Sequence, residues 1–212
     1  MSHIRLRYSA LILLLAQVAS LITSFAFIVC VSRFLQKPEF GGWFFVGSAL
    51  AYFHMSKQLL PFWFLRDIAR GKKVGGVGLL ANVLFSLPFL FLFLFFSFFF
   101  FTKLTGLSST VFLIASFFIP TYFTIEALNA IIRARYPQKL APYSIIVDTT
   151  KLLFLLFLLG YGLEGVLLAN LLALTIYIMY ALVVVRDELT GGSFSDVKKW
   201  LLLSWLPLYA II

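Results

Sequence analysis

Residues 43–65 read WFFVGSALAYFHMSKQLLPFWFL, an apolar run interrupted near its middle by the polar segment HMSKQ (54–58). An ionised side chain at mid-depth in a bilayer costs at least about 2.5 kcal/mol on insertion scales, so it normally faces water, a partner or a ligand. We therefore expect Lys57 to line an internal polar cavity of a membrane protein. The alternative is that Lys57 extends along its helix to the lipid head groups.

The composition also indicates a membrane protein. The 212-residue chain is 62% hydrophobic and 12% charged, with a mean hydropathy of +1.04. A soluble domain is usually about half apolar and a quarter charged, so the chain is expected to cross a membrane several times. Its net charge of +9 comes from basic residues scattered between apolar runs, which argues against a nucleic-acid partner. The single cysteine, Cys30, cannot form an internal disulfide.

Six apolar runs are long enough to be transmembrane helices. The first is longer than the apolar core of a signal peptide, which has about 7 to 15 residues. The runs cover residues 8–32, 43–65, 74–101, 110–132, 141–159 and 166–185. A seventh run begins near Trp200 and stops at Ile212, before a helix rising about 1.5 Å per residue can cross a core of about 30 Å.

These runs predict an all-α fold, a polytopic membrane helix bundle. We expect one six-helix lobe over residues 1–185, a cytoplasmic linker over 186–199 and the truncated start of a second lobe over 200–212. Pro61 removes a backbone donor and should kink the second run, whereas Gly75 and Gly76 allow close packing at the start of the third. Ser193 and Asp196 fit a helix-start box within the linker.

The basic residues predict the orientation of the chain. The segments after the second, fourth and sixth runs carry four, three and three Lys or Arg, and those after the first, third and fifth carry two, one and none. Because positively charged loops stay inside, we expect a multi-pass protein of the cell membrane with a cytoplasmic N-terminus.

Four charged residues fall near or within the cytoplasmic half of the predicted bundle: Lys57, Glu126, Asp148 and Lys151. Two cations and two carboxylates on three helices favour a hydrated cavity. Two alternatives stay open. Asp148 and Lys151 are spaced to pair on one helix face and can simply pin two helices together, and Glu126 can be interfacial.

Gln17, Ser20 and Ser24 share one face of the first predicted helix, where they can bond a neighbouring helix or line a cavity. No pattern indicates catalysis. The sequence has no HExxH, no cysteine cluster and no GxSxG, and its histidines are His3 and His54. We therefore expect neither an enzyme nor a metal site.

Four short segments follow one another in a familiar order: LQKPEFG (35–41), RDIA (66–69), RARYPQK (133–139) and GYGLEG (160–165) followed by Ala169. They resemble the Leu-Gly-Pro-Glu-Glu-Phe-Gly loop, the Arg-x-x-Ala helix end, the fourth-to-fifth helix junction and the Gly-x-Gly-Leu-x-Gly-x-x-x-Ala turn of polysaccharide and oligosaccharide flippases. Those proteins belong to the multidrug, oligosaccharidyl-lipid and polysaccharide exporter superfamily.

The resemblance implies an inner-membrane transporter of two six-helix lobes, of which this chain supplies the first. Such proteins move a polyprenyl-pyrophosphate-linked glycan from the cytoplasmic to the outer leaflet by alternating access. Cations in the cavity would then hold the pyrophosphate, because a lysine offers a point charge and three donors. From their depth and helix placement, we expect Lys57 and Lys151 to bind substrate, together with Gln17 and Gln58. We expect Asp148 and Glu126 to act in ion coupling or gating. No cofactor is implied.

Three other functions remain open at this stage. A drug or cation antiporter of the same superfamily would bind H⁺ or Na⁺ at Asp148 or Glu126. A structural membrane subunit would use its polar residues only for helix packing. An intramembrane enzyme lacks any catalytic constellation. For transport, the second wall of the path must come from a second lobe of the same protein or, if 212 residues is the native length, from self-association.

Overall fold

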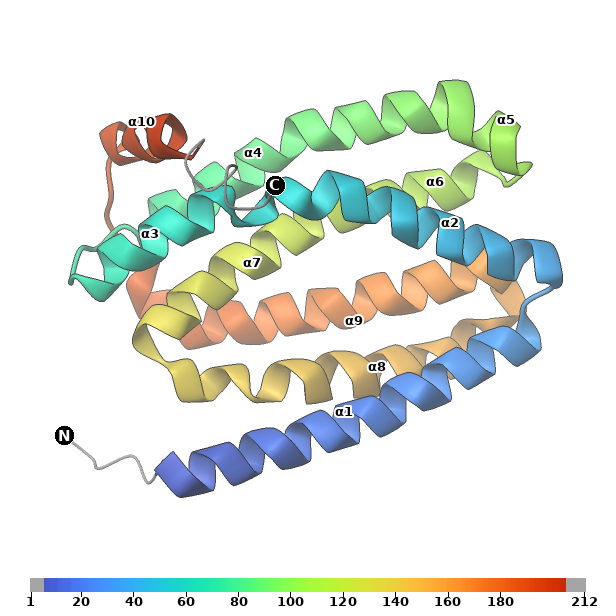
Figure 1. Ribbon diagram of the computed structural model, residues 1–212, viewed down its shortest axis with the longest axis horizontal. Coiled ribbons are helices and arrows are strands. Elements are labelled where there is room, and N and C mark those ends of the chain that lie inside the picture. Colours follow the sequence, from blue (N-terminus) through green and yellow to red (C-terminus); the bar gives the residue numbers. More distant parts are fainter. Residues whose placement is uncertain (1–5, 205–212) are drawn as a thin grey trace.

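The computed structural model describes residues 6–204, and every secondary-structure element in that part of the chain is helical. The predicted all-α fold is confirmed. Long helices lie side by side along one direction (Figure 1). They include α1 (Leu6–Phe34), α4 (Gly75–Phe96), α7 (Phe118–Arg135), α8 (Pro142–Leu158) and α9 (Gly162–Val185).

Several of the predicted runs are divided in the structure. The second comprises α2 (Lys37–His54), the 3₁₀ turn η1 (Met55–Gln58) and α3 (Leu59–Ala69). The third continues from α4 through a π-helical turn, η2 (Ser97–Phe101), into α5 (Thr102–Thr105), and the fourth comprises α6 (Ser109–Ser116) and α7. The remaining elements are η3 (Pro137–Leu140), η4 (Leu159–Tyr161), η5 (Arg186–Glu188) and α10 (Phe194–Leu203).

The break in the second run follows from Pro61. Proline has no amide hydrogen to donate to the carbonyl four residues earlier, which is that of Lys57. The side chain of the fully buried Asn82 takes over part of this role. Its Nδ2 donates to the Lys57 carbonyl at a long 3.5 Å and to the Phe123 carbonyl at 2.6 Å. The predicted disturbance therefore lies one turn before Pro61, and Asn82 ties it to α4 and α7.

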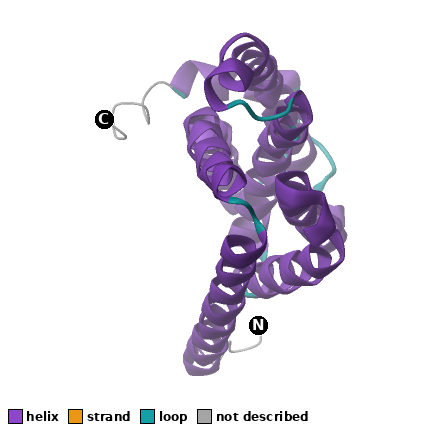
Figure 2. Ribbon diagram, turned by 90° about the vertical axis from the view of Figure 1, so that its right-hand side faces the viewer, coloured by secondary structure: helices purple, strands orange, loops and turns teal. Residues whose placement is uncertain are grey.

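The core of the bundle surrounds α7, which packs against α3, α4 and α9. Phe123, Leu128 and Ile131 of α7 are completely buried. In contrast, α1 packs mainly on α8 and leans away from the other helices in Figure 2. Apolar side chains such as Leu21 and Phe25 stay exposed on α1. An exposed apolar helix is typical of a chain whose surroundings are lipid or another helix rather than water.

Four helical stretches are long and apolar enough to cross a membrane. They are Gln17–Phe34, Gly75–Thr105, Ser109–Arg135 and Pro137–Glu188. The last stretch contains two separate helices, α8 and α9.

The glycines at the start of α4 permit a close approach, as predicted, but their neighbour is the linker backbone rather than another helix. A Cβ atom on Gly75 would lie 2.4 Å from the carbonyl oxygen of Glu188, and one on Gly76 would lie 2.2 Å from that of Leu189. The segment after α9 therefore packs directly on α4.

The final described helix begins earlier than predicted. The Ser193 and Asp196 capping box is present, so α10 starts at Phe194 instead of near Trp200 and includes the end of the predicted linker. The expected continuation of the seventh run, residues 205–212, lies outside the described residues.

The helix connections separate into two groups. Those after α3, α7 and α9 lie at one end of the bundle, and those after α1, α5 and α8 lie at the other (Figure 1). The more basic segments therefore share one end, called the basic end here. An ion pair of 3.4 Å between Arg135 and Glu188 joins two of these segments.

Candidate functional site

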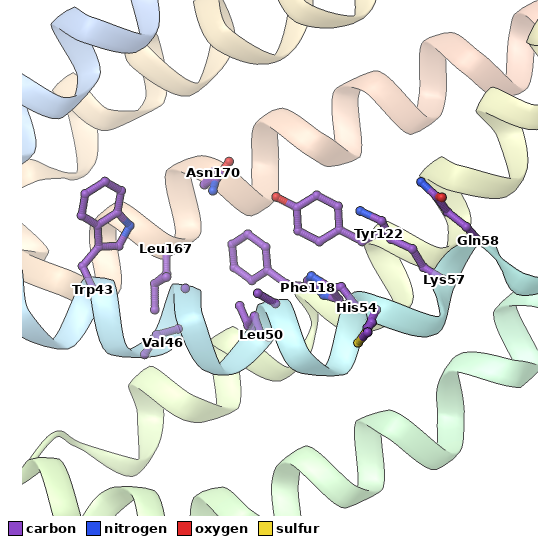
Figure 3. A pocket seen from close by; sticks show the side chains of 13 residues that line it. Trp43, Val46, Leu50, His54, Lys57, Gln58, Phe118, Tyr122, Leu167 and Asn170 are labelled. Carbon is purple, nitrogen blue, oxygen red and sulfur yellow. The ribbon is translucent and has the colours of Figure 1, made fainter. Parts of the chain in front are cut away.

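A cleft of about 620 Å³ opens between the α2 and η1 segment and helix α9, with part of α7 as a third wall. Figure 3 shows the side chains that line it. The cleft is mainly apolar, with a few polar groups that come from four different elements. The lining residues are Trp43, Val46, Gly47, Leu50, Ala51, His54, Met55, Lys57, Gln58, Phe118, Tyr122, Leu167 and Asn170.

Lys57 brings a positive charge to this cleft. It lies on η1, where the backbone departs from α-helical geometry. Its Nζ atom is 5.1 Å from the centre of the Tyr122 ring, an arrangement that favours a cation over the ring face (Figure 3). Within the described residues, no carboxylate lies within 4.0 Å of this ammonium group. The charge is therefore available to an anionic ligand.

His54 stands beside Lys57 on the same wall. Its ring centre lies 4.5 Å from that of Tyr122. Its Nε2 atom is buried and has no hydrogen-bond partner in the described part of the chain. Leaving a buried polar atom unpaired costs about 1–3 kcal/mol, so a ligand or water that bonds to it would be favoured.

Gln58 and Glu126 meet at a smaller pocket beside the cleft. Gln58 lines both the cleft and a neighbouring pocket of about 190 Å³, and Glu126 lines only that pocket. Glu126 is buried and accepts a hydrogen bond of 3.3 Å from Nη1 of Arg133. The carboxylate is thus paired with a cation of its own helix near the basic end.

Lys151 lies in a different place, the seam between α1 and α8. Its Nζ is 2.7 Å from Oδ1 of Asp148, so the predicted pair on one helix face is formed. Ser24 donates to the same oxygen at 3.0 Å, and Ser20 donates to the other carboxylate oxygen. The Lys151 ammonium also lies 4.7 Å from the centre of the Phe27 ring. These contacts join α1 to the bundle.

Gln17 belongs to neither group. It is exposed on α1 and lines a shallow groove there together with Ser20 and Ser24. Of the four residues expected to bind substrate, the structure therefore places Lys57 and Gln58 on the cleft and Gln17 and Lys151 outside it. Lys151 stays in the seam because Asp148, one turn earlier, compensates its charge.

Three cleft residues that carry a polar side-chain atom were not singled out from the sequence: Trp43, Tyr122 and Asn170. One signal pointed to Tyr122, because Phe118, Tyr122 and Glu126 recur every four residues and so share one face of α7. The described residues contain no group of three His, Cys, Asp or Glu that could hold a metal ion.

No protein-family model, curated protein or solved structure matches this chain.

Proposed function

We propose that this chain forms one lobe of a membrane transporter that moves a lipid-linked oligosaccharide from the cytoplasmic to the outer leaflet by alternating access. The observation that carries the proposal is Lys57, a cation without a carboxylate partner in the described structure, held in a 620 Å³ cleft between apolar helices. A buried or membrane-embedded charge of this kind is a functional-site hypothesis by default.

The membrane topology in this proposal has six spans. We add residues 43–65, which run through α2, η1 and the first part of α3, to the four apolar stretches and count α8 and α9 separately. The basic end then lies in the cytoplasm, together with the N-terminus. Single cysteines at Lys139 and Ser108, in a chain with Cys30 replaced by serine, test this arrangement. An impermeant maleimide applied to intact cells should label position 108 and leave position 139 unlabelled.

The cleft suits the diphosphate and sugars of such a substrate. Lys57 can donate to anionic oxygens and carries the compensating charge, and His54, Gln58 and Asn170 add polar groups around it. Trp43 and the other apolar residues supply the hydrophobic lining that is typical of ligand sites. The cleft is open on one side, where a second lobe or a second copy would provide the opposite wall.

The ion-coupled antiporter alternative receives less support. Asp148 and Glu126, the carboxylates expected to couple ions, are each already paired with a cation, Lys151 and Arg133. A bound Na⁺ would have to displace that cation first. We therefore assign the substrate charge to Lys57 and leave Lys151 a structural role.

Binding of a polyprenyl diphosphate to the purified protein in nanodiscs tests the proposal directly. Lys57→Gln should weaken binding roughly tenfold, because it removes one charge-assisted contact. Lys37→Gln is the matched control, since Lys37 is an exposed lysine at the far end of the same α2 helix, and it should bind like the wild type. Equal affinity of both variants would refute the role of Lys57. If the chain is a purely structural subunit, neither the wild type nor the two variants should bind the polyprenyl diphosphate.

A further inference from the structure

A further pocket lies at the basic end, between the end of α3 and α10. It measures about 180 Å³, a size for a small group rather than a drug-sized molecule. Both helices supply its walls. The lining residues are Trp63, Arg66, Asp67, Arg70, Lys199, Trp200 and Leu203.

The pocket holds an excess of positive charge. Arg66, Arg70 and Lys199 line it, and none of them has a carboxylate within 4.0 Å in the described part of the chain. The one carboxylate in the lining, Asp67, is already engaged. It lies 2.8 Å from Nζ of Lys72 and accepts a 3.0 Å hydrogen bond from Nε1 of Trp200.

Two features of the pocket favour a hydrogen-bond acceptor as ligand. The Arg66 guanidinium lies 4.9 Å from the ring centre of Phe62 and 5.7 Å from that of Trp63, so aromatic faces hold it in place. The Trp63 Nε1 is buried and has no hydrogen-bond partner within residues 6–204. Two arginines, a lysine and an unused indole donor therefore line the pocket, and its one carboxylate, Asp67, is engaged by Lys72 and Trp200. Phosphate oxygens bind such donor sets well.

We propose that this pocket binds the phosphate of an anionic phospholipid head group. The pocket directly follows the 43–65 run, where a membrane helix reaches the cytoplasmic surface, and clusters of Lys and Arg at that depth attract anionic lipids. The inference rests on the proposed membrane orientation. It is independent of the cargo of the cleft, because the two pockets have no lining residue in common.

Bound phosphate would also hold α10 on the bundle. The walls come from α3 and α10, so one anion can contact Arg66 or Arg70 on one helix and Lys199 on the other. The indole hydrogen bond from Trp200 to Asp67 already joins the same two helices. The bound lipid and the Trp200–Asp67 hydrogen bond would therefore both hold α10 against α3.

Lipid retention in native mass spectrometry tests the site, with protein released from nanodiscs that contain phosphatidylglycerol or only phosphatidylcholine. The wild type should retain phosphatidylglycerol preferentially, and Arg70→Gln and Lys199→Gln should each lower its retention roughly tenfold. Arg186→Gln is the matched control. It removes the same charge at the same end, but Arg186 lies outside the pocket and is paired only with Asp187.

An equal loss in Arg186→Gln and Arg70→Gln would overturn the proposal, because it would show general attraction to a basic surface. Equal retention of the two lipids by the wild type would overturn it as well. Inorganic phosphate, added as a competitor, identifies the source of the ligand. Displacement shows that the phosphate group alone occupies the site, and retention shows that the whole lipid is recognised. Lys57→Gln should keep the lipid, so failure of this site and failure of the cleft are distinguishable.

Discussion

Two lysines that the sequence treats alike have opposite surroundings in the structure. Lys57 faces an open cleft, 5.1 Å from the Tyr122 ring, with no carboxylate close to it in the described residues. Lys151 lies 2.7 Å from Asp148, whose carboxylate also accepts hydrogen bonds from Ser20 and Ser24 of α1. Both positions interrupt an apolar run of membrane length.

The two lysines differ in their pairing with a carboxylate. A paired lysine stabilises a helix contact, and removing either partner leaves a costly unpaired charge. An unpaired lysine contributes nothing comparable to stability, so its presence in a cleft favours a role in binding. Four variants test this distinction.

The largest effect is expected for Asp148→Ala. The substitution leaves the Lys151 ammonium without its carboxylate in a seam where both side chains are largely buried, with 14% and 12% of their surfaces exposed. Breaking a buried pair in this way costs about 3–5 kcal/mol. Unfolding of the protein in bicelles should show that loss of stability.

The double variant Asp148→Ala with Lys151→Ala provides the control for this prediction. Removing both charges should recover much of the lost stability, because no unpaired charge remains. If the double variant is as unstable as the sum of the two single variants, the ion pair is not the source of the effect.

Ser24→Ala should have the next largest effect. Ser24 donates to Oδ1 of Asp148 at 3.0 Å and links α1 to α8. Its loss should cost about 1–2 kcal/mol, between the values for membrane hydrogen bonds and for bonds to charged groups. The same unfolding measurement checks it. Ser48→Ala, at an exposed position on α2, should leave the stability unchanged. A loss of similar size at both positions would show that the seam has no special role.

Much of the fold could be predicted from the sequence, because apolar runs and basic loops are local signals. The all-α class and the capping box at Ser193 are confirmed. The 3₁₀ turn at Met55–Gln58 and the packing of Gly76 against the Leu189 carbonyl were not predictable in detail. Both depend on a distant partner, Asn82 for the turn and the post-α9 segment for the glycine.

The candidate site was harder to predict, because a sequence gives the depth of a residue but not the direction in which it points. The structure places Lys57 and Gln58 on the cleft. Lys151 was expected in the same cavity, but it pairs with Asp148, which two serines of α1 bond, and so lies in the seam. The i,i+3 spacing of Asp148 and Lys151 predicted their pairing, but the hydrogen bonds from α1 to Asp148 could not be predicted from the sequence.

A third charged cluster surrounds Asp67, which follows the predicted 43–65 span. Its ion pair with Lys72 depends on pH. Burial alone would raise the pKa of the Asp67 carboxyl. Hydrogen bonds from Lys72 and Trp200, together with the positive charges of Lys72 and Lys199, outweigh burial, so the pKa lies below the ordinary value of 3.8. A lowered carboxyl pKa contributes stability above 3.8 and loses it as the pH falls through the lowered value.

Asp67→Asn should therefore be less stable than the wild type by about 1 kcal/mol at neutral pH. The difference in stability should shrink as the pH falls below 3.8 and through the lowered pKa, because the wild-type carboxyl then loses its charge. Unfolding midpoints of both proteins across this range measure it. Asp187→Asn, at an exposed position of the same end, should show no such dependence. A constant difference at all pH values would mean that the charge of Asp67 is irrelevant.

Lys57→Met should have the smallest effect on stability, and it tests the difference between Lys57 and Lys151 most directly. The variant loses a cation–π contact with Tyr122, worth about 0.5–1 kcal/mol, but it also removes an unpaired charge from an apolar bundle. The two terms oppose each other, so the free energy of unfolding should change by less than about 1 kcal/mol. Lys151→Met should cost several times as much, because it leaves Asp148 unpaired. If both substitutions destabilised the protein equally, Lys57 would be a structural residue, and its charge would no longer support an anionic ligand in the cleft.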